Sequence, residues 1–253
     1  MLNLNFSFTA WDFVLLVAVS LMGTALAYLH HPKWKSLILS LPIPFTVANL
    51  SLGQGVNATH VLGLFFLLIY THGVRVLHVR LGLPIILSIV LSAGVYATMG
   101  VLLAGVVPTT ETAFWTLSVA LFALSLVVLR LTAHRHEPGH RTPLPVWVKL
   151  PIIAAVICLL IIGKKMLQGF MTMFPMVGLV AAYEARHSLW TICRTIPAFS
   201  LCMLPMMAVI HVAQPYTGLG GGLGLGWVVY LALLIPSTLR HWRLTEEQVE
   251  PDA

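Results

Sequence analysis

Apolar residues run along this chain in long, nearly unbroken blocks that are separated by short polar or turn-forming segments. Blocks such as LLVAVSLMG and ALFALSLVVL lack the alternation of polar and apolar positions that the strands of a membrane barrel would show, so helices are predicted. A helix that crosses ~30 Å of hydrocarbon needs about 20 mostly apolar residues. Nine segments meet or approach that length: Trp11–Leu29, Trp34–Leu52, Ala58–Val79, Leu83–Val107, Thr112–Leu131, Val146–Gly163, Met166–Tyr183, Leu189–Ala213 and Leu223–Leu239.

The composition agrees with a chain that lies in a membrane. Of the 253 residues, 58% are hydrophobic and 9% are charged, and the mean hydropathy is +0.93. Soluble domains carry about 25% charged residues, and a chain this apolar is also the reverse of a disordered one. The recurrence of apolar blocks excludes a single membrane anchor. We therefore predict an all-α polytopic membrane protein in which residues 1–253 form one integral membrane domain.

The basic residues predict which side of the membrane each loop faces. With the amino terminus outside, nine spans put twelve of the 14 Lys and Arg residues in the cytoplasm and leave only Lys164 and Lys165 outside. Cytoplasmic loops carry such an excess, so the formal net charge of +6 needs no nucleic-acid partner. The pattern predicts a bacterial inner-membrane protein with its carboxyl terminus in the cytoplasm and the lipid bilayer as its partner. A homodimer is left open.

The segments group into two halves around the longest connection. Residues 1–131 form the first helical half and residues 146–239 the second, with a basic cytoplasmic loop at 132–145 and a polar cytoplasmic tail at 240–253. Two alignments of the halves indicate related four-helix repeats. One pairs the Gln-Gly dipeptides at 54 and 168 and implies a parallel duplication, whereas the other pairs LSLPIPFTVA with FMTMFPMVGLVA and implies inverted halves. Either arrangement is typical of secondary transporters.

Prolines interrupt one span in each half. Pro42 and Pro44 fall inside the second span and Pro175 inside the seventh. Proline removes a backbone hydrogen bond, and carbonyl groups released in this way are tolerated at membrane depth only in the protein interior or in a cavity. Interrupted spans in both halves therefore indicate a transport site. The alternative is that proline is simply commoner in membrane helices.

Polar residues that break the apolar pattern are the candidates for function, because a charged side chain in a span is costly. The richest group lies in the predicted turn between spans seven and eight. Glu184 is interpreted there as a proton-coupling carboxylate, with fixed positive charge on Arg186 and Arg194. The alternative is a solvated turn whose charges pair, and Lys165 has a similar alternative as a lysine that reaches the outer headgroups. The predicted lining of a substrate pathway is Asn49, Tyr70, His72, Lys165, Gln168, Tyr183, Glu184, Arg186 and His187.

The histidines offer a haem-based alternative. His60 and His211 fall near the outer ends of spans three and eight, and His72 and His187 near their inner ends, so each span would present one imidazole at each of two depths. No HExxH motif or Cys pair indicates zinc. No metal or cofactor and no enzyme activity is therefore expected. The bunched methionines are interpreted as core filling, and Gly218–Gly226 as a loop.

One stretch resembles a known family. GFMTMFPMVGLVAAYEARHSLWTICRTIP is similar to the pattern of small four-helix GlpM-type inner-membrane proteins, in which Gly-x-x-x-x-Phe-Pro precedes a short polar turn. The matching positions are Gly169, Phe174 and Pro175, followed by the turn at Tyr183–Arg186. The resemblance covers about forty residues and implies a helical unit without assigned chemistry. The arrangement of four plus four helices also resembles the drug/metabolite transporter superfamily in architecture alone.

Three functions follow from these observations. The first is a permease that moves a small molecule or ion across the inner membrane, coupled to protons through Glu184. The second is a membrane subunit or assembly factor that binds a cytoplasmic partner through the basic loop. The third is a haem-binding electron carrier.

Overall fold

The computed structural model describes residues 9–133, 137, 145–162 and 164–247. Helices and turns account for this part of the chain, and no strand occurs in it, as the apolar blocks predict. The helices are α1 (Ala10–Tyr28), α2 (Pro32–Leu39), α3 (Ile43–Leu52), α4 (Ala58–Arg75) with the π-helical turn η1 (Val76–Arg80), α5 (Ile85–Ala104), α6 (Glu111–Leu131), α7 (Val146–Ile162), α8 (Lys164–Leu167), α9 (Gly169–Thr172), α10 (Met176–Glu184) and α11 (Leu189–Glu247).

Within the described ranges, six helical segments are long and apolar enough to cross a membrane. Lys33–Leu52 joins α2 to α3, and Leu189–Leu239 is a single segment of 51 residues. Two further predicted spans are shorter here, since α7 has 17 residues and the region from Gly169 to Glu184 is divided between α9 and α10. The structure therefore has the helical class that the sequence predicts, and nine spans remain a prediction.

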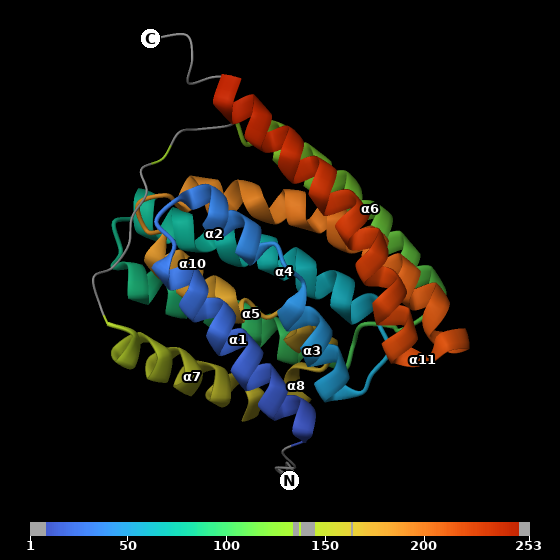
Figure 1. Ribbon diagram of the computed structural model, residues 1–253. Coiled ribbons are helices and arrows are strands. Elements are labelled where there is room, and N and C mark those ends of the chain that lie inside the picture. The colour runs from blue at the N-terminus through green and yellow to red at the C-terminus, as the bar shows by residue number, and fades with distance from the viewer. Residues whose placement is uncertain (1–8, 134–136, 138–144, 163, 248–253) are drawn as a thin grey trace.

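Helix α4 lies at the centre of the bundle (Figure 1). It packs against α5, α6, α9 and the first part of α11, and α1 packs on the outside of this group between α3, α7 and α10. Large apolar side chains remain exposed on the outer helices. Val90 of α5, Val119 of α6 and Val228 of α11 are examples. In a membrane these faces would meet lipid rather than water.

The glycine-rich tract of α11 is helical, so its prediction as a loop is wrong. Gly218 has φ +71° and marks a kink at which two helices meet. Beyond the kink the chain runs back beside the first helix, and a Cβ on Gly222 would lie 3.3 Å from the carbonyl oxygen of Ile210. Small residues four apart let two membrane helices approach closely. The glycines at 222 and 226 therefore allow a tight helical hairpin instead of breaking the helix.

The carboxyl-terminal segment is partly helical. Helix α11 continues to Glu247, so part of the predicted polar tail is helical, and residues 248–253 lie outside the described residues. Most of the predicted basic loop likewise lies outside them. Its described residues include Ala133, whose carbonyl oxygen accepts a bond from the indole of Trp190 at 2.7 Å, and Glu137.

Candidate functional site

Two interrupted helices meet inside the bundle, and both breaks occur at the prolines that the sequence singled out. The chain leaves helical geometry between α2 and α3 near Pro42, and again between α9 and α10 near Pro175. Pro44 has no N–H to donate to the carbonyl oxygen of Ser40, and the hydroxyl of Tyr230 donates to that oxygen instead. The carbonyl oxygen that Pro44 leaves without a helical partner thus accepts a hydrogen bond from a side chain of α11.

A second irregularity precedes the Pro175 break. Gln168 has φ +47°, and it is the one non-glycine residue with a positive φ in the described part of the chain. The next helix, α9, is only four residues long, and Tyr96 donates a bond of 2.8 Å to the carbonyl oxygen of Phe170 within it. Tyr70 donates to the carbonyl oxygen of Gly178 at 3.3 Å on the far side of the break. The two buried tyrosines thus form hydrogen bonds with the backbone on both sides of the Pro175 break.

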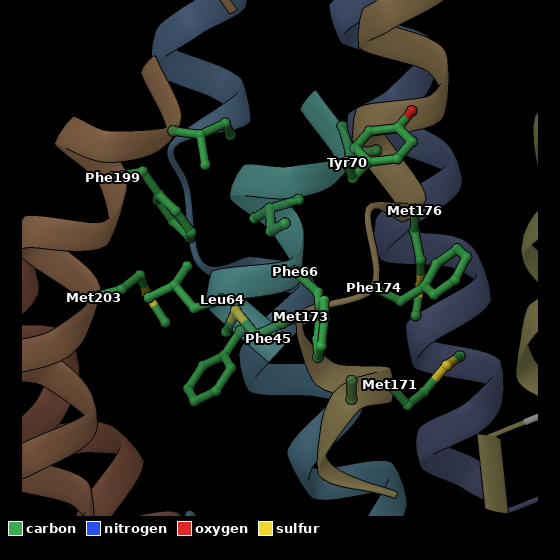
Figure 2. Close-up of a cluster of buried hydrophobic side chains, with 14 of the residues drawn as sticks. Phe45, Leu64, Phe66, Tyr70, Met171, Met173, Phe174, Met176, Phe199 and Met203 are labelled. Carbon is green, nitrogen blue, oxygen red and sulfur yellow. The ribbon is translucent and has the colours of Figure 1, made fainter. Parts of the chain in front are cut away.

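A cavity of about 60 Å³ lies between the two breaks. Its walls are mostly apolar and come from both interrupted regions, from α4 and from α11, with the hydroxyls of Thr71 and Thr172 among the few polar groups. Figure 2 shows the side chains at this place as one buried cluster, with aromatic rings and methionines from several helices. The members that line the cavity include Phe45, Met173, Phe174, Met176 and Phe199. The interpretation of the methionines as core filling agrees with their burial here.

A buried charge cluster lies at the end of α10. The carboxylate of Glu184 is 2.8 Å from the ammonium group of Lys149, and these side chains are only 3% and 5% exposed. Lys35 of α2 donates to the backbone carbonyl of Glu184 at 3.0 Å, and Lys149 also donates to the carbonyl of Ala27 at 3.2 Å. The ring of Tyr28 lies 4.9 Å from the Lys149 ammonium group. Residues from four helices, α1, α2, α7 and α10, therefore meet at Glu184.

A second, smaller hollow lies beside this cluster. Its volume is about 10 Å³, and it is lined by Lys35 and by the hydroxyl-bearing residues Ser36, Ser188 and Thr191. Leu39 and Ile192 line both spaces. The smaller hollow and the larger cavity are therefore neighbours along the same helices.

The predicted turn cluster separates into different environments. Glu184 is buried, whereas His187 is exposed. Arg186 is partly buried, donates to the carbonyl of Tyr183 at 3.2 Å and lies over the ring of the same residue. Arg194 reaches the end of α6, where it donates to the carbonyl of Thr132. The turn is thus not one solvated group of charges, because its carboxylate is enclosed by neighbouring helices.

The other predicted pathway residues do not share one lining. Asn49 is buried and its amide oxygen is 3.0 Å from Nε2 of His60, while its amide nitrogen donates to the carbonyl of Phe45. His72 is partly buried with Nδ1 on the carbonyl of Leu68, and the side chain of Gln168 is exposed. The side chain of Lys165, like that of Lys164, lies outside the described residues.

The outward histidines are held by protein groups on both ring nitrogens. His60 contacts Asn57 and Asn49, and His211 contacts the carbonyl of Val56 and the carboxylate of Glu111. A haem iron would have to displace one of these partners from each ring. Within the described ranges, no group of three or more His, Cys, Asp or Glu side chains could hold a metal ion. The geometry gives the haem alternative no support.

Sequence reasoning missed the two lysines that meet Glu184. Lys35 and Lys149 were counted only as positive charge on the cytoplasmic side. The available signal was position, because Lys149 lies within the apolar block VWVKLPII, where a charged side chain needs a partner. Because Glu184 lies 35 positions further along the chain, the sequence does not indicate that it pairs with Lys149.

Comparison with models of known protein families, with curated proteins and with solved structures gave no match to this chain. The resemblance to GlpM-type proteins and to drug/metabolite transporters therefore remains a prediction.

Proposed function

We propose that this protein is an inner-membrane permease for a small solute, which binds in the cavity between the two proline breaks. The observation that carries the proposal is the meeting of two interrupted helices at an internal space. Continuous helices pack against one another without exposing backbone, whereas interrupted ones form the binding sites of many transporters. Interruption also provides hinges at which half-helices can move.

The lining favours a solute with an apolar body and one negative charge. Aromatic, methionine and proline side chains surround the larger space. The adjoining hollow is lined by Lys35 and by the hydroxyl-bearing residues Ser36, Ser188 and Thr191, and Lys35 brings positive charge to it. A short-chain sulfonate or carboxylate has this combination of groups.

Glu184 supports proton coupling. Its carboxylate is paired with Lys149, and Lys35 donates to its backbone carbonyl. Protonation of Glu184 removes the negative charge from this pair and leaves the cluster more positive, which favours an anion in the adjoining hollow. Proton and anion would therefore bind together.

The proposed topology has nine spans in a bacterial inner membrane, with the amino terminus outside. Division of α11 at Gly218 supplies two spans, and α7 and the interrupted region Met166–Tyr183 supply two more. We favour the inverted repeat of the two proposed alignments, because a proline break occurs in each of the segments that it pairs.

Flux measurements in liposomes containing the purified protein test this function. We expect 1-butanesulfonate to enter faster than in empty liposomes, and the cation butyltrimethylammonium to show no such difference. Transport of the cation alone would overturn the proposed preference for an anion, although the protein would still be a permease. Entry of neither ion, and of no neutral compound of similar size, would overturn the permease itself.

The role of Lys35 has a matched control in Lys33, which is two residues earlier and lines neither space. We expect Lys35→Met to lower sulfonate flux at least tenfold and Lys33→Met to leave it unchanged. Thermal unfolding of both variants checks that each is folded. Equal flux in the two variants would contradict the proposed anion site.

The role of Glu184 is tested by the dependence of flux on pH. We expect the wild-type protein to transport faster at acid pH, and Glu184→Gln to show little difference between pH 6 and pH 8. Because the neutral amide would leave the Lys149 charge buried without a counter-charge, the double variant Glu184→Gln/Lys149→Met is measured alongside it. If both retain the wild-type profile, Glu184 does not couple protons.

A further inference from the structure

We propose that His211 and Glu111 form a pH-operated clamp at the end of the bundle opposite to Glu184. His211 lies in the first part of α11, and Glu111 is the first residue of α6. About 26 Å of helix separates His211 from Arg194 at the other end, at a rise of 1.5 Å per residue. This inference concerns different residues from the solute site and does not depend on the proposed transport function.

The hydrogen bonds of His211 require a proton on each ring nitrogen. Nδ1 lies 2.8 Å from the carbonyl oxygen of Val56, and Nε2 lies 2.9 Å and 3.0 Å from the two carboxylate oxygens of Glu111. A carbonyl oxygen and an ionised carboxylate only accept hydrogen bonds, and a neutral imidazole has one N–H. Both bonds can therefore form together only when His211 is an imidazolium ion.

The aromatic surroundings of His211 also suit a positive charge. Its ring is stacked on Phe114 with a centroid distance of 3.9 Å and an interplanar angle of 16°, and Trp115 lies 6.2 Å away at nearly a right angle. A cation over an aromatic face is stabilised by the ring's quadrupole. Glu111 itself is 75% exposed, so protons from water can reach the pair.

The clamp joins three parts of the chain. It ties α11 to the start of α6 and to the segment between α3 and α4, where Gln214 also accepts from the N–H of Val56 at 2.8 Å and donates to its carbonyl at 3.1 Å. The next residue, Asn57, caps α4 and contacts His60, which is the other titratable side chain near this site. His60 in turn contacts Asn49 of the interrupted helix α3.

Loss of the His211 proton must break one side of the clamp. A neutral ring with its proton on Nδ1 keeps the bond to the Val56 carbonyl and directs a lone pair at the Glu111 carboxylate. A neutral ring with its proton on Nε2 keeps the bond to Glu111 and directs a lone pair at the Val56 carbonyl. Because the closed arrangement holds the proton, its contribution to stability is present at acid pH and is lost as the pH rises and the proton leaves. The connection between α3 and α4 is then held by fewer bonds.

Two substitutions should change this pH response in opposite directions. In Glu111→Gln, the side-chain amide can donate to the lone pair of a neutral His211, so the clamp should stay closed at every pH. In His211→Gln, the side chain is neutral and cannot make both contacts, so the clamp should be open at every pH. His78→Gln is the matched control, because His78 has a single backbone contact, from Nδ1 to the carbonyl of Leu83.

Hydrogen–deuterium exchange of the purified full-length protein, corrected for the intrinsic effect of pH, measures the clamp directly. Between pH 6 and pH 8 we expect exchange in residues 53–58 and 111–115 to rise several-fold in the wild type and in His78→Gln. It should stay low in Glu111→Gln and high in His211→Gln. The thermal midpoint of the wild type should fall over the same range, whereas that of Glu111→Gln should not.

The same pH response in all four proteins would overturn the proposal. So would exchange in the wild type that does not change with pH, because a clamp that needs no imidazolium ion would then hold the segment. Either result can be reached whether or not the protein transports a solute.

Discussion

At the scale of single residues, burial of Glu184 distinguishes it from the other charges of its turn. The sequence predicts Glu184 as a candidate because carboxylates are rare in this chain. It leaves open whether the group is solvated or enclosed, since a turn at a membrane boundary permits both. The structure encloses it with Lys149 and places Lys35 on its backbone carbonyl. The proposed coupling role depends on this enclosure.

Removal of one charge from the Lys149–Glu184 pair should strongly lower the stability of the protein. We expect Lys149→Met or Glu184→Gln to lower the free energy of unfolding by about 3–5 kcal/mol, because each removes one charge of a buried ion pair. The double variant Lys149→Met/Glu184→Leu should recover most of this loss, because packing replaces both charges. Reversible unfolding in detergent gives the three values.

Lys33→Met serves as the control for removal of a lysine from this end of the bundle, and we expect it to cost less than about 1 kcal/mol. If Lys149→Met costs no more than Lys33→Met, the pair does not contribute to stability as proposed. If the double variant is as unstable as the sum of the single ones, the two side chains are not coupled.

At the scale of helices, proline marks positions at which a helix can break, and tertiary packing decides which of them do. Breaks occur at Pro42 and Pro175, which lack the N–H of a helical hydrogen bond. Other prolines lie inside helices without a break: Pro151, Pro197, Pro205, Pro215 and Pro236. The glycine tract shows the opposite case. Glycine permits several backbone conformations, so the same residues are compatible with a loop and with a helix. Close contact between Gly222 and Ile210 selects the helix.

The contact between α4 and the unwound segment, residues 173–175 between α9 and α10, depends on the absence of a side chain at Gly63. A Cβ on Gly63 would lie 2.9 Å from Cβ of Met173 and 3.1 Å from the hydroxyl of Tyr96. Because Cβ of Met173 cannot move without its backbone, we expect Gly63→Ala to destabilise the protein by about 1–3 kcal/mol. It should also lower flux by displacing the wall of the cavity.

Gly94→Ala on α5 is the matched control, because nothing lies within 4 Å of its added Cβ. We expect that variant to be as stable as the wild type or more stable by up to about 1 kcal/mol, from its higher helix propensity. Thermal unfolding and flux are measured for both variants. Equal behaviour of the two would show that α4 and the unwound segment do not pack as described.

At the scale of the whole molecule, the structure changes how the partner-binding alternative should be tested. Glu137, within the predicted basic loop, accepts bonds from the backbone N–H groups of Trp190 and Thr191 at 3.2 Å and 2.6 Å. It therefore caps the start of α11. Deletion of the loop would remove this cap and damage the fold, whatever the function.

A sharper test replaces only the charges of the loop. We expect the double substitution Arg135→Gln/Arg141→Gln, with Glu137 retained, to leave solute flux unchanged, whereas a partner-binding protein would lose its activity in cells. Glu137→Gln alone should lower stability by about 1 kcal/mol, as loss of a helix cap does. Loss of cellular function in the double variant with normal flux would favour the partner-binding alternative.

The proposed orientation can be measured by thiol labelling in a background that lacks the three native cysteines. Thr109 lies between α5 and α6, and Leu81 lies between η1 and α5 at the other end of the bundle. With the amino terminus outside, we expect a membrane-impermeant reagent to label Thr109→Cys in intact cells. Leu81→Cys should be labelled only after permeabilisation. The reverse pattern would invert the proposed topology.

The sequence by itself determined the helical class, the approximate places of the helices and the prolines at which a helix can break. These properties follow from local chemistry: runs of apolar side chains need a medium without water, and proline cannot donate a hydrogen bond. Tertiary structure alone decided that Lys35 and Lys149 meet Glu184, that Glu137 caps α11 and that Val56 and Glu111 share His211. Each of these contacts joins residues far apart in the chain, and no local pattern encodes which distant group will satisfy a buried charge or a released backbone atom. The candidate site belongs to this second class, because its walls come from helices that only folding brings together.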